Sequence, residues 1–351
     1  MNLLSRTKDR FLDFGEVHYV VDSDYRTAAQ GWSRADRTGP LDLYLERANA
    51  QFQYVFRTAD YTAPVDRNCI QAAIDAAIDF RQDAVFFTPG NYSLATTALS
   101  VDAADLRLLG PRCSHPCRAS VTLTDALGTH DITGAADRIE VGYLRFVPLT
   151  AQAFWQLATG ADQHHWHDFF YDTTGVTAST ATQMFLVDGT WNNTVVEDFL
   201  IHNDGASGPF CELDGLVSNL IIRNFHIFSR AGTLSVALLD IDGGSTSAVA
   251  TGYGGIYVGH GRGTLGPSAV LVSHLIDVTS QLSSVSPIGF VEDFIGQSGF
   301  CATGTMVTAV GNEFGIINCG LAPTDGTASP TINTSTDTLT VSWARMYPYS
   351  S

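Results

Sequence analysis

The triplets Val187-Asp188-Gly189, Leu213-Asp214-Gly215 and Ile241-Asp242-Gly243 repeat an apolar-Asp-Gly pattern in the middle of this 351-residue chain. Two earlier triplets have Thr in place of Asp: Ile132-Thr133-Gly134 and Ala158-Thr159-Gly160. The five glycines are 26, 29, 26 and 28 residues apart. A period of this length is typical of a solenoid, in which each repeat buries its apolar face only by stacking on its neighbours.

A second motif, apolar-x-x-apolar-x-apolar, follows in phase with the triplets and begins at Val141, Trp166, Val196 and Ile222. Its last three residues alternate as in a strand with one buried face, so Leu200 and His226 are expected to point outward. Its third residue breaks the alternation and predicts a corner, because Asp and Asn tolerate left-handed backbone angles. These third residues are Tyr143, Asp168, Asp198 and Asn224.

Short strands joined by tight corners predict the coils of a parallel β-helix. A leucine-rich repeat is the competing solenoid at this period, but its Leu-x-x-Leu-x-Leu line with Asn or Cys is absent from the chain.

A helical pattern over residues 66–81 precedes the repeats. Asp66 is placed to cap this helix, and its apolar face is expected to hold Ile70, Ala73, Ile74, Ala77 and Ile78. A strand at 84–88, a turn at Pro89-Gly90, a second strand and a third strand at 106–109 follow. We expect the helix to cover the open end of the solenoid, whose core would otherwise meet water.

This segment resembles the start of the pectate-lyase-like β-helix superfamily. Chains of that superfamily open with Asp-x-x-x-Ile-Gln-x-Ala-Ile-Asp, a strand into Phe-x-Pro-Gly-x-Tyr, and an apolar strand ending in Gly. The matching residues here are Asp66, Ile70, Gln71, Ala73, Ile74, Asp75, Phe87, Pro89, Gly90, Tyr92 and Gly110. The chain departs from the pattern at Gln82-Asp83, where the superfamily has several glycines. The resemblance covers about residues 64–320 and implies a right-handed parallel β-helix.

The predicted fold class is therefore all-β, in three segments. Residues 1–62 do not repeat and are expected to form an attachment or oligomerisation element, with Val17, Tyr19 and Val21 alternating as a strand would. Residues 63–320 form the β-helix with its N-terminal capping helix. Residues 321–351 are rich in Thr, Ser and Pro before an alternating strand at 338–343, and predict a small C-terminal β cap or trimerisation strands.

Composition excludes several classes of partner. A net charge of −17, with Lys8 as the single lysine, repels phosphate, so nucleic acid is not an expected partner. No run of 18 apolar residues predicts a membrane span, and the first ten residues lack the apolar core of a signal peptide. We therefore expect the chain to fold in a cytoplasm.

The six cysteines are expected to be reduced thiols in such a compartment. The segment Cys113-Ser114-His115-Pro116-Cys117 could supply half of the ligands of a zinc site. No second ligand pair follows at a suitable spacing. No metal or other cofactor is expected.

The repeat places carboxylates together on one outward face. Equivalent positions of successive coils lie about 4.8 Å apart. The residues before the glycines form one column, and those two positions earlier form another: Asp131, Leu157, Leu186, Glu212 and Asp240. Glu212, Asp214, Asp240 and Asp242 are thus the predicted catalytic carboxylates, with Asp188 above them as a substrate-binding residue.

Carboxyl groups this close raise one another's pKa, which creates the acid and base that glycoside hydrolysis needs. The same carboxylates could instead bind Ca²⁺. A third interpretation is that Asp-Gly only forms turns and that the carboxylates are solvated without a function. The sequence leaves these three readings open.

His167, Glu197 and Arg223 form a second outward column, assigned here to substrate binding. A surface charge ladder without function fits the same residues. The next residue of each coil lies at the predicted corner. These residues, Asp168, Asp198 and Asn224, are expected to stack one above another, and we call them the corner ladder.

Members of the superfamily that lack signal peptides are often phage tail spikes, which are homotrimers. The resemblance therefore implies a virion spike or fibre assembled in the host cytoplasm. It would bind tail or baseplate proteins through its N-terminal region and attach to a bacterial surface polysaccharide, with cleavage of that glycan left open. The alternatives are a free polysaccharide lyase or hydrolase, and a purely structural virion β-helix.

Overall fold

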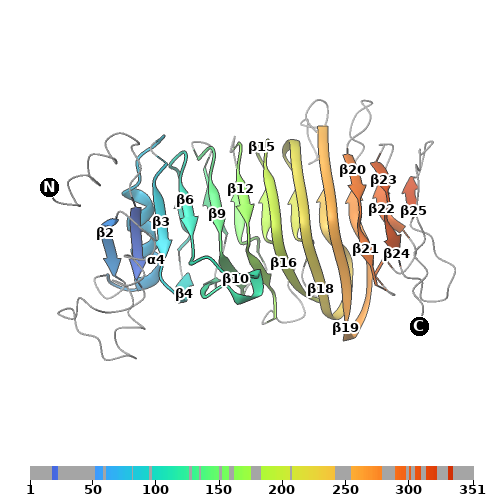
Figure 1. Cartoon of the computed structure of the whole chain (residues 1–351), viewed down its shortest axis with the longest axis horizontal. Helices are drawn as coiled ribbons and strands as arrows, with labels where there is room; N and C mark the ends of the chain where they lie inside the picture. The colour runs from blue at the N-terminus through green and yellow to red at the C-terminus, as the bar shows by residue number, and fades with distance from the viewer. Residues whose placement is uncertain are drawn as a thin grey trace.

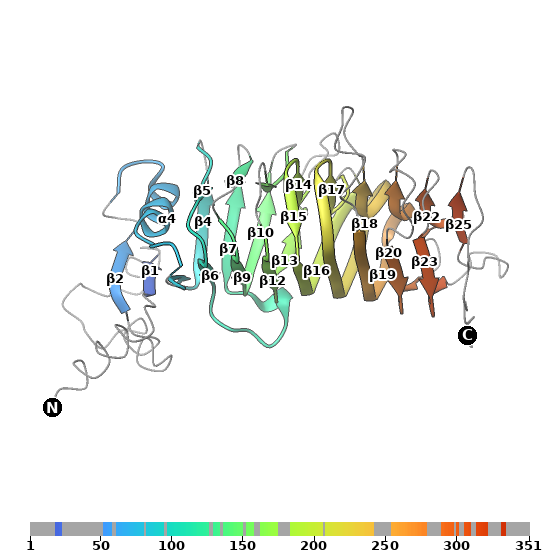
Figure 2. The ribbon, with the colours of Figure 1, turned by 90° about the horizontal axis from the view of Figure 1, so that it is seen from above.

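The computed structural model describes a chain wound into a parallel β-helix. The described residues are 18–22, 52–57, 61–80, 82–94, 97–125, 129–133, 136–149, 152–157, 162–174, 183–205, 208–241, 254–278, 289–297, 300–301, 305–309, 314–321 and 331–334. Their 25 strands belong to one hydrogen-bonded sheet that winds along the long axis of the molecule (Figures 1 and 2). Neighbouring coils pair in parallel, with equivalent residues side by side, as the repeat predicts.

The coils build three faces. The first face contains β5 (Ser100–Val101), β8 (His130–Ile132), β11 (Trp155–Leu157), β14 (Phe185–Val187), β17 (Cys211–Leu213), β22 (Thr305–Ala309), β25 (Thr331–Thr334), and the last residues of β18 (Leu216–Ile241) and β19 (Gly254–Val278).

The second face contains β1 (His18–Asp22), β2 (Phe52–Arg57), β3 (Ala84–Phe87), β6 (Arg107–Leu109), β9 (Glu140–Gly142), β12 (His165–His167), β20 (Gly289–Glu292), β23 (Phe314–Ile317), the start of β16 (Val195–Gly205), and the early residues of β18 and β19. The short strand β15 (Thr190–Asn192) precedes this face and pairs with the start of β18.

The third face contains β4 (Gly90–Leu94), β7 (Val121–Asp125), β10 (Leu144–Pro148), β13 (Phe170–Asp172), β21 (Ile295–Gly296), β24 (Gly320–Leu321), and the middle of β16, β18 and β19.

Left-handed residues turn the chain between these faces. Between the second and third faces, seven coils carry one at the same position, with φ between 51° and 60°: Tyr143, Asp168, Asp198, Asn224, His260, Asp293 and Asn318. This confirms the predicted corner. A second column precedes the second face: Gln82, Asp105, Arg138, Gln163, Asn193, Asn219 and Gly255. Corner N–H groups donate to the next coil, as from Asp168 to the Glu197 carbonyl at 3.3 Å.

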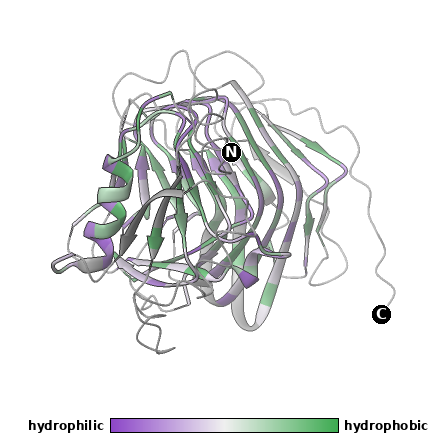
Figure 3. Cartoon of the chain, turned by 60° about the vertical axis from the view of Figure 1, so that its left-hand side comes forward, coloured by the Kyte–Doolittle hydropathy of each residue, from purple (hydrophilic) through white to green (hydrophobic). Residues whose placement is uncertain are grey.

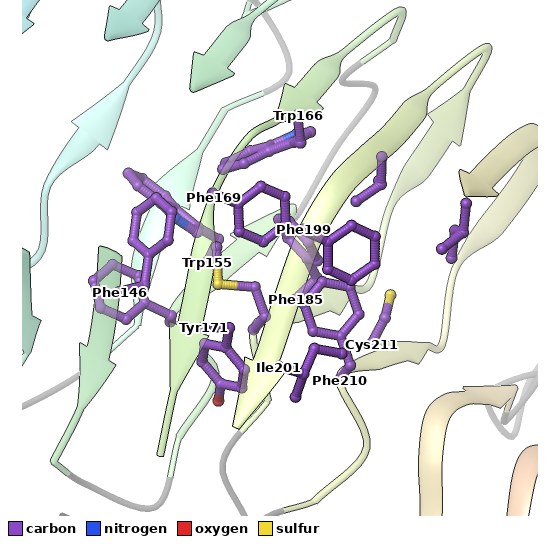
Figure 4. Close-up of a cluster of buried hydrophobic side chains, with 14 of the residues drawn as sticks. Phe146, Trp155, Trp166, Phe169, Tyr171, Phe185, Phe199, Ile201, Phe210 and Cys211 are labelled. Atoms are coloured by element: carbon purple, nitrogen blue, oxygen red, sulfur yellow. The ribbon is translucent and has the colours of Figure 1, made fainter. Parts of the chain in front are cut away.

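Inward side chains fill the solenoid with stacked aromatic rings (Figure 4). Phe169 and Phe199, at equivalent positions, have parallel rings 5.0 Å apart, and Phe225 continues the stack at 5.6 Å. The next residue in this column is Gly261, where a Cβ would lie 2.2 Å from the Phe225 ring. The absence of a side chain there lets Phe225 reach Phe294, with the ring centroids 6.1 Å apart.

Along the strands, buried and partly exposed residues alternate, as in β7, β10 and β11. Figure 3 shows the corresponding alternation of hydrophobic and hydrophilic residues. Leu200 and His226 are both only partly buried, as expected for outward positions.

The helix α4 (Val65–Asp75) is shorter than the predicted range 66–81. Ile70, Ala73 and Ile74 are buried in the core, whereas Ile78 is 54% exposed. The helix cannot continue because the Ile78 N–H donates to the side chain of buried Asp83 and Phe80 takes a left-handed φ of 61°. In the described residues, no helix is long and apolar enough to cross a bilayer.

The predicted cap at Asp66 is also wrong. Pro64 occupies the N-cap position without a side-chain hydrogen bond, and the Asp66 carboxylate accepts the N–H of Ser93 at 2.7 Å instead. This contact joins α4 to β4. The predicted strands at 84–88 and 106–109 are confirmed as β3 and β6.

Sheet pairing extends into both terminal segments. β1, which confirms the strand predicted around Val21, pairs with β2 and β3, and β25 pairs with β22. These strands continue the sheet across the predicted boundaries at 62 and 320, and the roles assigned to the two end segments stay predictions. The strand predicted at 338–343 lies outside the described residues.

All six cysteines are free thiols, and Cys69, Cys211, Cys301 and Cys319 are buried. Cys113 is partly buried and Cys117 is exposed, with its Sγ 2.9 Å from His115 Nδ1.

Two buried histidines are held in the neutral form. His164 Nε2 donates to the Ala136 carbonyl at 2.9 Å and its Nδ1 faces the Trp191 N–H, while His130 Nδ1 accepts the Leu99 N–H at 3.0 Å. Burial lowers the pKa of each to about 4. Because the unfolded chain binds these protons below about pH 6.5, each histidine reduces stability as the pH falls from there to about 4.

We predict that His164→Gln flattens this dependence. Between pH 7 and pH 5 the variant should lose about 2 kcal/mol less stability than the wild type, an order-of-magnitude figure. Urea unfolding at the two pH values measures the difference. If both proteins lost the same unfolding free energy between the two pH values, the buried His164 would not cause the pH dependence.

Candidate functional site

The predicted carboxylates of the first face are partly brought together. Glu212 and Asp240 are register partners on β17 and β18, and Asp214 lies beside them at the end of β17. Asp242 lies outside the described residues. Glu212 accepts a hydrogen bond from Gln183, and Asp188 accepts one from Gln156. The adjacency of Glu212 and Asp240 is confirmed, and their catalytic role stays a prediction.

One member of the predicted outward column is wrong. Leu157 pairs with Ile132 and Val187, which are inward residues, and it is fully buried. Gln156 takes the outward position between Asp131 and Leu186. Aligning the coils on their glycines displaced this coil by one residue, and a one-residue shift exchanges the two faces of a strand.

The predicted second-face column is in register. His167, Glu197 and Arg223 follow one another across β12, β16 and β18. Arg223 donates to Glu197, with Nε 2.7 Å and a terminal nitrogen 2.6 Å from Oε2. His165 lies 2.9 Å from the other Glu197 oxygen.

His167 does not pair with Glu197 but bridges two other carboxylates. Its Nε2 lies 3.1 Å from Glu140 Oε1, and its Nδ1 lies 3.0 Å from Asp168 Oδ2. Both ring nitrogens can donate only as imidazolium. We call the group Glu140, His165, His167, Asp168, Glu197 and Arg223 the histidine–carboxylate cluster.

Gly142 makes room for the His167 ring. A Cβ at Gly142 would lie 2.5 Å from the ring, so the imidazole lies across this glycine to reach Glu140. Tyr143 meets the ring edge-on at 5.1 Å and is held at a left-handed φ of 60°, which is rare for an aromatic residue. The same left-handed corner recurs at the equivalent position of six other coils, so this backbone angle belongs to the fold.

The cluster shifts the pKa values of its members. Burial lowers the pKa of His167, but the hydrogen bonds to Glu140 and Asp168 raise it by more, so the net pKa is raised. The His167 hydrogen bond lowers the pKa of Glu140 against the effect of burial. Burial raises the pKa of Glu197, yet His165 and Arg223 bring it below its ordinary value.

The corner ladder adjoins the cluster. Asp168 and Asp198 occupy equivalent positions one coil apart, since His167 pairs with Glu197 and Phe170 with Leu200. Partial desolvation and the charges of Glu197 and Asp168 raise the pKa of Asp198, opposed by a hydrogen bond from Asn224. Asp198 thus binds its proton more strongly than an ordinary Asp, whereas the Asp168 carboxylate contacts the His167 ring.

Glu140 and His165 are absent from the site that the sequence predicts, and Asp168 and Asp198 are predicted there as corner residues alone. His165 could have been found, because it lies two residues before His167 and therefore on the same strand face. Glu140 reaches His167 only through the open space at Gly142, a contact that no sequence pattern contains.

In the described residues, no group of three or more His, Cys, Asp or Glu side chains is placed to hold a metal ion.

No protein-family model matches the chain, and no curated protein matches it. Among solved structures, the catalytic domain of a GH87 alpha-1,3-glucanase in complex with nigerose matches with 9% identity and a TM-score of 0.27, covering 77% of this chain and 66% of that chain. Two variants of that domain match with 8% and 9% identity and a TM-score of 0.26. The present chain spans less than two thirds of the glucanase domain, and a likeness this weak carries no information about its chemistry.

We predict that the His167 ring titrates above the ordinary histidine pKa of about 6.5, and that Glu140→Gln lowers its pKa. NMR titration of the ring protons measures both. His226, whose pKa is lowered chiefly by burial, provides an internal control in the same spectra. A His167 pKa at or below the ordinary value, or one unchanged by Glu140→Gln, would contradict the bridge.

Proposed function

We propose that this protein binds a polysaccharide along its second and third faces and hydrolyses it at the corner ladder. The observation that carries this proposal is the pair Asp168 and Asp198. Their backbones lie one strand spacing apart, about 4.8 Å. This spacing allows the two carboxyl groups to reach the separation of about 5 Å that retaining glycosidases use.

The two carboxyl groups differ in the way that hydrolysis requires. Asp198 has a raised pKa and donates its proton to the glycosidic oxygen as the bond to the anomeric carbon breaks. Asp168, whose carboxylate His167 orients, attacks that carbon to form a glycosyl ester. Asp198 then takes a proton from water, which displaces the ester and restores both groups.

The neighbouring side chains suit a glycan. His165 and Arg223 are roughly half exposed, with side-chain exposures of 44% and 46%, and both are oriented by Glu197. They present hydrogen-bond donors beside the corner, where hydroxyl groups of a sugar would lie. The sequence suggests that His167 binds substrate. In this proposal His167 instead positions the Asp168 carboxylate, because both of its ring nitrogens already face carboxylates.

We further propose that the chain acts as a homotrimeric virion spike or fibre. Support comes from the sequence: the resemblance to β-helix tail spikes, and end segments that do not repeat. In this proposal the N-terminal region binds other tail or baseplate proteins, and the rod attaches to a bacterial surface glycan.

We predict that the protein releases reducing ends from a bacterial capsular polysaccharide or lipopolysaccharide. Asp168→Asn and Asp198→Asn should each lower kcat by about 100-fold or more. Glu212→Gln and Asp240→Asn provide matched controls and test the first-face carboxylates directly. Loss of activity in Glu212→Gln and Asp240→Asn alone would show that the catalytic carboxylates lie on the first face and would refute the corner assignment.

The same assay separates the alternatives. Unsaturated uronate among the products would indicate a lyase. No release from any glycan of a panel that includes one to which the protein binds would favour a structural β-helix without catalysis.

Light scattering should give about three times the 37.7 kDa mass of one chain. A stable monomer at micromolar concentration would contradict the spike proposal while leaving the hydrolysis proposal in place.

A further inference from the structure

Six outward side chains of the third face form a compact array over three coils. One row contains equivalent residues of β16, β18 and β19, and a second row lies two residues further along the same strands. Arg262 is exposed and the other members are partly exposed. The first row is Leu200, His226 and Arg262, and the second is His202, Phe228 and Thr264; we call these six residues the third-face array.

The array begins beside the corner ladder. Leu200 follows Asp198 by two residues, and His226 follows Asn224 by two. A polysaccharide that lies across the corner at Asp198 therefore meets the array within one sugar residue, because the rise per strand residue is about 3.3 Å.

Contacts orient the imidazole rings of the array. His226 Nε2 lies 2.8 Å from the Thr264 hydroxyl. The His202 ring packs against Phe228 at 5.4 Å, and Phe170 meets it edge-on at 4.7 Å.

Basic groups surround His226 although the chain carries a net charge of −17. Arg262, His202 and His115 all lower the pKa of His226, after the larger effect of burial. His115 directly precedes the short 3₁₀ helix η2 (Pro116–Arg118), which packs against β10 and β16.

Carboxylates compensate little of this charge. Asp172 Oδ1 lies 3.9 Å from His202 Nδ1, but Arg145 and Thr174 already bind the Asp172 carboxylate. Within the described part of the chain, Arg262 forms no ion pair. Arg262 is thus an exposed positive charge on an acidic protein, and the neighbouring imidazole rings can add hydrogen bonds to an anion that it binds.

We propose that the third-face array binds the anionic substituent, carboxylate or phosphate, of an acidic polysaccharide. Arg262 offers the planar paired donors that match both groups. His226 and Thr264 add hydrogen bonds, and Phe228 gives an apolar surface for a sugar ring. This inference rests on the proposed glycan binding and adds the class of substrate.

The test compares three ligands that share one ring: glucose, glucuronate and glucose 1-phosphate. Isothermal titration calorimetry at low ionic strength should show at least fivefold tighter binding of one or both anionic ligands than of glucose. Preference for glucuronate identifies a uronate-bearing glycan, and preference for glucose 1-phosphate a phosphorylated one. No preference over glucose would overturn the proposal.

Variants then locate the site. Arg262→Gln and His226→Gln should each abolish most of the preference, and Arg262→Lys should retain part of it through charge. Arg230→Gln removes an exposed arginine from the same strand as His226 and should leave binding unchanged. An equal loss in Arg230→Gln would indicate general charge attraction and refute the array. Circular dichroism of each variant verifies the fold.

These outcomes are independent of cleavage. Anion preference without released reducing ends would refute the hydrolysis proposal alone. Hydrolysis of a neutral glycan, with no anion preference, would refute the array alone.

Discussion

The structure depends on the parallel hydrogen-bond ladder between coils. Each coil must return to the same lateral position before its N–H groups can meet the carbonyls of the next coil, and two left-handed corners per coil achieve that return. An L-residue in this conformation costs roughly 1–2 kcal/mol, least for Asn and Asp, and glycine avoids the cost because it has no Cβ. Most corners between the second and third faces accordingly carry Asp or Asn. Tyr143 departs from this preference, and it does so beside His167.

The same ladder converts sequence repetition into rows of side chains. Inward rows become the stack of Phe169, Phe199 and Phe225, where equal spacing suits parallel rings. Outward rows place charges at the same spacing, which is unfavourable for like charges and favourable for alternating ones. The histidine–carboxylate cluster alternates basic and acidic groups, as in His165, Glu197 and Arg223. Where the alternation fails, at the corner, partial desolvation and the charges of Glu197 and Asp168 raise the pKa of Asp198. That carboxyl group is therefore the proton donor of the proposed reaction.

Glycines determine where a side chain can contact a residue outside its own row. Gly142 leaves space that the His167 ring enters, so His167 reaches back one coil to Glu140 instead of forward to Glu197. Gly261 does the same in the core and joins Phe225 to Phe294. In both cases a missing side chain creates a contact between residues that are not neighbours in the repeat.

The sequence by itself determined the period, the corners and the direction of most strand residues, because these follow from local backbone preference and from burial repeated in every coil. It placed His167, Glu197 and Arg223 in one row correctly. It could not supply the register at Leu157, where the loop lengths of neighbouring coils differ and only pairing selects the face. It also could not supply the end of α4 or the partners of His167. Those were decided by tertiary contacts, through the Asp83 side chain and the space above Gly142, since both join residues whose separation along the chain has no fixed relation to the repeat.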